Sequence, residues 1–107
     1  MGTVISYNDK FATPYSEIEL ASGERIVLAL DRSGLVVKTP AGPTGAEQVL
    51  FAGDPDVVAG ICLGLAGDQA QSLSPLQVLV AAVTHIPNIQ AVTAAFKQAA
   101  EIGRAHV

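Results

Sequence analysis

The chain holds few residues whose types and spacing could support chemistry. Asp54 and Asp56 are separated by one residue, and such a pair could hold a metal ion or move protons. The later oxygen ligands of a calcium loop are missing from the residues that follow. Both acids also suit the start of a helix, where negative charge is favourable. We therefore assign them to helix capping and predict neither a metal site nor a cofactor.

Cys62 is the only cysteine, and it lies in an apolar run with no cation near it in the sequence. A nucleophilic thiol needs a pKa lowered by a cation or by a helix N-terminus. Neither is at hand, so we predict a buried structural thiol. A chain without a cysteine framework is typical of the reducing cytoplasm, which is the location we expect.

Four residues could furnish the polar groups of a small-ligand site: Tyr7, Tyr15, His85 and Asp68. Ligand pockets are mostly apolar with a few placed polar groups, so a carrier or enzyme with a pocket between sheet and helices is one hypothesis. His85, near the end of a predicted helix, could also hydrogen-bond a terminal carbonyl or act as a charge switch. The spacing of the four residues does not by itself bring them together, and we predict no catalytic residue.

Nucleic-acid binding is excluded by charge. Ten acidic residues against six basic ones give a net charge of −4, and the basic residues are scattered. Affinity for nucleic acids depends on lysine and arginine neutralising phosphates. The glycine-rich segment 41–45 lacks the Lys-Ser/Thr ending of a phosphate-binding loop, so we interpret it as a connection between strands.

The first half of the chain is predicted to be an antiparallel meander. Alternating apolar residues and glycine-containing turns are typical of short strands joined as hairpins. Parallel strands would need long crossovers, which the spacing does not allow. Four or five strands are expected: 16–20, 25–31, 35–38 and 47–52, with residues 3–7 as a candidate for an additional N-terminal strand.

Three helices are predicted in the second half, at 55–66, 75–86 and 89–102. Asp54 followed by a proline opens the first, a Ser74–Gln77 capping box opens the second, and Asn88 caps the third. The third helix has an apolar stripe and a polar side, as a surface helix should. The prediction is one α+β domain over residues 1–107, with the helices forming a layer on the sheet.

The first two helices differ from the third because they lack a polar side. Residues 39–96 contain no lysine or arginine, and only 15% of the chain is charged against a usual level of roughly 25%. Neither helix reaches the roughly 20 apolar residues of a membrane span, and the N-terminus has no secretory signal pattern, so we predict no membrane association. A domain of this size has little interior, and surplus apolar surface normally marks a binding site.

We therefore predict a homo-oligomer, most simply a dimer, with Val57, Leu63 and Val78 in its interface. Gly60 and Gly64, four residues apart, predict a close approach of the first helix to the sheet or to a partner. The function would be binding or regulation rather than catalysis. One alternative is the small-ligand protein described above, with an apolar ligand. Another is a subunit of a hetero-assembly, such as a phage or mobile-element protein, that uses the same apolar face.

Overall fold

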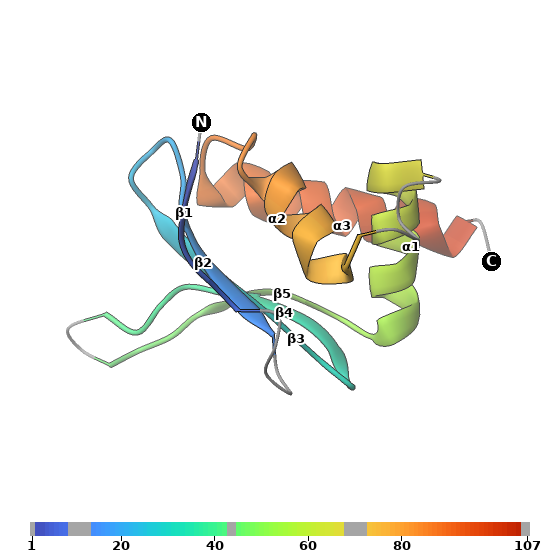
Figure 1. The fold of residues 1–107 in the computed structure, drawn as a ribbon, viewed down its shortest axis with the longest axis horizontal. Coiled ribbons are helices and arrows are strands. Elements are labelled where there is room, and N and C mark those ends of the chain that lie inside the picture. Colours follow the sequence, from blue (N-terminus) through green and yellow to red (C-terminus); the bar gives the residue numbers. More distant parts are fainter. Residues whose placement is uncertain (1, 9–13, 43–44, 68–72, 106–107) are drawn as a thin grey trace.

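A computed structural model describes residues 2–8, 14–42, 45–67 and 73–105, with side chains as far as Glu101. It contains five strands followed by three helices (Figure 1). The strands are β1 (Thr3–Asn8), β2 (Tyr15–Glu19), β3 (Arg25–Asp31), β4 (Gly34–Lys38) and β5 (Val49–Gly53). The helices are α1 (Pro55–Ala66), α2 (Pro75–Val83) and α3 (Ile89–Ala105). The predicted α+β meander with a helical layer is confirmed.

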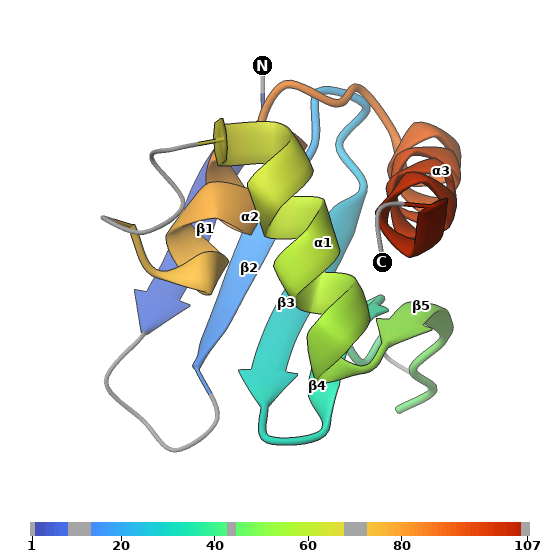
Figure 2. The same cartoon turned by 90° about the vertical axis from the view of Figure 1, so that its right-hand side faces the viewer.

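The sheet has the strand order β1-β2-β3-β4-β5, and every neighbouring pair is antiparallel. β1 and β5 are therefore its two edge strands. Figure 2 shows all three helices on one side of the sheet, with α1 and α2 in front of the strands and α3 beside β5. This leaves one covered and one open face, as is common for antiparallel sheets.

The hydrophobic core fills the space between the covered face and the helices. Alternate strand residues such as Ile18, Ile26 and Val37 are fully buried there. From the helices, Ile61, Leu79 and Val92 complete the core. Ser16 is the one buried polar residue among those described, and its hydroxyl donates to the carbonyl oxygen of Ser6 at 2.9 Å. Phe51 of β5 stacks on Phe96 of α3, with ring centroids 5.5 Å apart, which ties the sheet edge to the third helix.

The helix starts agree with the capping signals in the sequence. The Asp54 carboxylate accepts from the Val57 amide at 2.9 Å. Ser74 and Gln77 form the complete capping box, each side chain accepting from the backbone N–H of the other. The Asn88 side chain accepts from the Ala91 amide at 2.8 Å.

The main difference from the prediction is the end of α2, which stops at Val83 rather than at residue 86. The amides of His85 and Ile86 bond three residues back instead of four, so the chain tightens before Pro87. The Thr84 hydroxyl donates to the carbonyl of Ala81, and the Thr84 carbonyl accepts from the Gly2 amide at 2.8 Å. The last turn is thus used to hold the beginning of β1. The end of α3 also differs from the prediction, because the helix continues three residues beyond residue 102, to Ala105.

No helix in the described part of the chain is both long enough and apolar enough to cross a membrane.

Candidate functional site

The outer side of α1 is the most unusual surface of the molecule. Residues 57–67 contain no charged side chain and, apart from the thiol of Cys62, no polar one. The core-facing residues of this helix are Val58, Ile61 and Cys62. On the opposite side Ala59 and Leu63 are exposed, and Leu63 has 62% of its surface accessible. A helix at a protein surface normally turns a polar side to water, but α1 has only Asp56, in its first turn, as a charged residue on this side.

Leu65 is a second exposed apolar residue of α1, half accessible to solvent. By helical periodicity it lies on the side of Val58 and Ile61, at the last turn, and not beside Leu63. The amide of Gly67 closes the helix by donating to the Leu63 carbonyl. The exposed apolar surface of α1 therefore has a main part around Leu63 and a separate part at its end.

An apolar depression lies directly beside Leu63. Its first part has a volume of about 490 Å³, and Leu30, Val58, Cys62, Leu63 and Pro75 are among the residues that line it. A second part of about 280 Å³ shares Leu30, Asp31 and Pro75 with the first and extends to Leu76. Because the two parts adjoin at these shared residues, we name them together the α1 trough, which lies between α1, the β3–β4 hairpin and the start of α2.

Charged groups occur at the rim of the trough on the β3–β4 turn. Asp31 lines both parts and Arg32 lines the second. The Asp31 carboxylate accepts from the Ser33 hydroxyl and from the Ser33 amide, and these bonds hold the pKa of Asp31 below its usual value. The rim thus offers one fixed negative group and one positive group beside an apolar floor.

Cys62 forms part of the trough wall and is buried, as predicted. Its Sγ lies 3.8 Å from the Pro75 carbonyl oxygen, and burial raises the pKa of the thiol. A raised pKa keeps the thiol protonated near neutral pH, so the residue behaves as a small apolar side chain and not as a nucleophile.

The three residues predicted for an oligomer interface lie in different environments. Leu63 is exposed beside the trough, whereas Val57 is only partly accessible and packs against the core. Val78 retains 4% of its surface and lies in the core of its own chain. Of the three, Leu63 alone offers a large apolar surface to a second molecule.

The glycine Gly64 of α1 also lies on an open side of the helix. We predicted that Gly60 and Gly64 mark a close approach to the sheet or to a partner. A Cβ atom built on Gly64 would have no neighbour within 4 Å. The chain's own sheet therefore does not approach the helix at Gly64, and this side of the helix is open.

The three described residues of the proposed small-ligand site do not gather in one place. Tyr7 pairs with Ser16 on the covered side of the sheet, whereas Tyr15 pairs with Ala29 on the open side. His85 is exposed and follows Thr84, which holds the start of β1. Tyr7 lies five residues farther along that strand from Gly2, a distance of about 16 Å. Asp68 is outside the described residues.

No group of three or more metal-ligating side chains occurs among the residues that the structure describes.

The trough residues Leu30 and Pro75 were not predicted from the sequence, because the walls of the trough come from three separate elements. The exposed side of α1, in contrast, is visible in the sequence, because residues 57–67 contain no charged side chain. Comparisons of the chain with protein-family models, characterised proteins and solved structures give no match.

Proposed function

We propose that this protein is a small cytoplasmic binding or regulatory protein that self-associates as a dimer through the outer side of α1 and the α1 trough. The observation that carries the proposal is the exposed Leu63 beside an apolar depression, on a helix with no charged side chain after Asp56 in its first turn. Large exposed apolar patches on a small domain are typical of interaction sites. The cytoplasmic location rests on the single cysteine.

A two-fold dimer explains why a protruding side chain and a depression lie side by side. In such an interface the same surface is used by both copies, so each surface must complement itself. Leu63 of one copy can enter the trough of the second, and the reverse contact follows by symmetry. Asp31 and Arg32 at the rim carry opposite charges, which allows each to meet the other across the axis.

The size of the trough supports an interface that reaches beyond α1. A stable dimer buries about 800 Å² on each partner. Leu63 alone cannot supply this area, but the trough continues to Leu30, Pro75 and Leu76, and the neighbouring Leu73 is also exposed. The proposed interface therefore includes α1, the β3–β4 turn and the start of α2.

The test compares two charge insertions at equally exposed apolar residues. Leu63 and Val49 are 62% and 60% accessible, but only Leu63 lies in the proposed interface. We expect light scattering after size exclusion to give a dimer for the wild type and for Val49→Glu, and a monomer for Leu63→Glu. Burying an unpaired carboxylate in an apolar interface is strongly unfavourable, which is the basis of this expectation.

The proposal is wrong if the wild-type protein stays monomeric at all accessible concentrations. A Leu63→Glu variant that remains dimeric would place the interface elsewhere on the molecule. Circular dichroism of both variants is the control for folding, because both replaced side chains are exposed and their loss leaves the core intact.

The volume of the trough favours one alternative function. Its larger part, about 490 Å³, lies within the range of small-molecule sites and has an apolar lining. A carrier of an apolar ligand would use this same depression. A set of aliphatic and aromatic probe compounds that raises the melting temperature of a monomeric wild-type protein would favour this alternative over the dimer.

A further inference from the structure

A second depression lies on another side of the molecule, between β5 and α3. It has a volume of about 830 Å³, and we call it the β5–α3 groove. On one side it is lined by three consecutive residues, Gln48, Val49 and Leu50. Val49 is 60% accessible, whereas Leu50 packs against the core. Because neighbouring strand residues point to opposite sides of a sheet, a hollow that touches all three follows the strand edge.

That edge is not paired with any other described strand, since β5 is the last strand in the sheet order. The strand consists of Val49, Leu50, Phe51, Ala52 and Gly53, so it contains neither a charge nor a proline. Natural proteins usually protect exposed sheet edges with such residues, because a bare edge pairs readily with another extended chain. β5 is short and has a register irregularity opposite β4, but its side chains offer no such protection.

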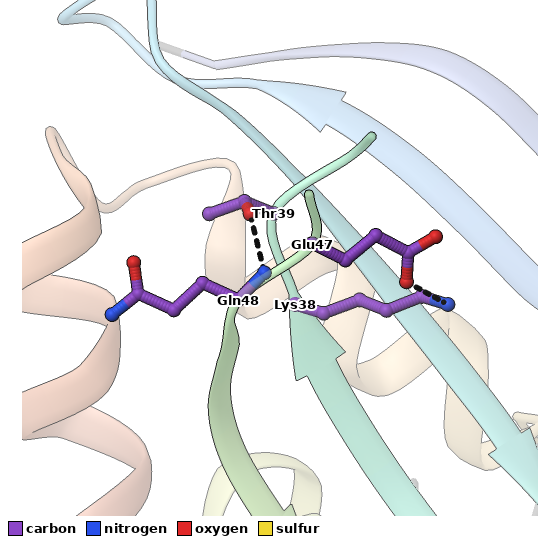
Figure 3. Close-up of polar contacts among 4 residues, drawn as sticks. All are labelled: Lys38, Thr39, Glu47 and Gln48. Carbon is purple, nitrogen blue, oxygen red and sulfur yellow. Dashed lines mark hydrogen bonds and ion pairs between the residues drawn. The ribbon is translucent and has the colours of Figure 1, made fainter. Parts of the chain in front are cut away.

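The two residues just before β5 are fixed to the end of β4 and the residue after it. The Thr39 amide donates to the Gln48 carbonyl at 2.9 Å, and the Gln48 amide donates to the Thr39 hydroxyl oxygen at 3.0 Å. Lys38 and Glu47 form an ion pair at 2.9 Å. Figure 3 shows the Gln48–Thr39 hydroxyl bond and the Lys38–Glu47 ion pair, with the Gln48 side chain pointing away from Lys38 and toward α3. These contacts hold the start of the strand in place, and the side-chain carboxamide of Gln48 points toward the groove.

The opposite wall is one stripe of α3, formed by Gln90, Thr93, Ala94 and Lys97. These residues follow helical spacing and extend over about 10 Å. An extended chain covers that distance with about three residues. The groove therefore has the dimensions of a short extended segment lying between a strand edge and a helix.

The charged residues of the groove differ in what they already bind. One carboxylate oxygen of Glu24 accepts from the Ser22 hydroxyl at 2.9 Å and from the Ile89 amide at 3.2 Å. Glu24 thereby holds the start of α3. Lys97 is exposed and forms no ion pair among the described residues. Lys97 is thus the cation available to a ligand, and it complements a carboxylate.

We infer that the β5–α3 groove binds an extended segment of a partner protein by strand addition to β5. The segment carries an acidic side chain opposite Lys97 and aliphatic residues against Val49 and Ile89. A second copy of β5 fits less well because the strand has no carboxylate, and the preceding Glu47 is paired with Lys38. Main-chain hydrogen bonds supply affinity in this mode of recognition, and alternate side chains supply specificity. This inference does not depend on the dimer proposed above, since the two surfaces share no residue.

The test begins with random peptides displayed on phage and selected on the wild-type protein. Selected peptides are then synthesised, and their binding is measured by fluorescence anisotropy. We expect acidic residues to be enriched at one position, and Lys97→Glu to weaken binding about fivefold or more. N-methylation at alternate peptide positions should weaken binding about fivefold for each strand hydrogen bond lost, with little effect at the positions between.

The matched control is Leu63→Glu, which should become monomeric and still bind the peptides. Val49→Lys, which narrows the groove, should lose peptide binding and remain a dimer. The inference is overturned if no peptide is enriched, or if N-methylation has the same effect at every position. It is also overturned if Val49→Lys, and not Leu63→Glu, abolishes self-association, since a second copy would then occupy β5.

Discussion

At the scale of single residues, the hairpin between β3 and β4 depends on Gly34. This glycine has a φ of +124°, and a Cβ atom built on it would lie 1.9 Å from the carbonyl oxygen of Gly53. The start of β4 therefore passes against the end of β5 at a distance that excludes any side chain. The sequence predicts a turn at this glycine, but the contact with Gly53 depends on a strand that lies far along the chain.

Replacement of Gly34 by alanine should destabilise the protein by about 3 kcal/mol or more, because the strained backbone and the clash act together. Gly23 is the control, since it also has a positive φ, +90°, but has open space around its Cβ position. Gly23→Ala should cost only about 1 kcal/mol, from backbone strain alone. Urea unfolding of both variants at one protein concentration measures the difference. Equal losses would show that the Gly53 contact relaxes at little cost.

At the scale of elements, the sequence predicts the starts of helices better than their ends. Asp54, Ser74 and Asn88 act locally, through bonds to amides three residues ahead, so their role can be recognised from spacing. Just after α2, the Thr84 carbonyl accepts from the Gly2 amide, which comes from the other end of the chain. No local pattern contains that information, and the predicted end was three residues too late.

The capping box of α2 is open to a direct measurement. This helix has only nine residues, and short helices form poorly without tertiary contacts and caps. Ser74→Ala should lower the free energy of unfolding by about 1 kcal/mol, because the Gln77 amide loses its acceptor. Ser74→Asp keeps an acceptor and should stay within a few tenths of a kcal/mol of the wild type. Equal destabilisation of both variants would contradict a role in capping.

At the scale of the whole molecule, composition predicts how much apolar surface there is but not which helix exposes it. Both α1 and α2 lack a polar side in the sequence, and both were expected to need cover from outside the chain. In the fold, Leu76, Val78 and Leu79 of α2 are buried in the core, whereas Leu63 of α1 remains exposed. This difference between the two helices depends on how each packs on the sheet, which is a tertiary property. The β5–α3 groove was missed for the same reason, because its two walls are separated by the first two helices.

The proposed dimer predicts that stability depends on protein concentration. If the dimer unfolds to two separate chains, each tenfold rise in concentration stabilises it by about 1.4 kcal/mol per dimer, or roughly 0.7 kcal/mol per chain. For a domain of this size that corresponds to a rise in Tm of about 3 °C. The Leu63→Glu variant, as a monomer, should have a Tm that does not depend on concentration. Differential scanning calorimetry of the two proteins over a wide concentration range makes the comparison, and parallel slopes would mean that Leu63 is not part of what holds the copies together.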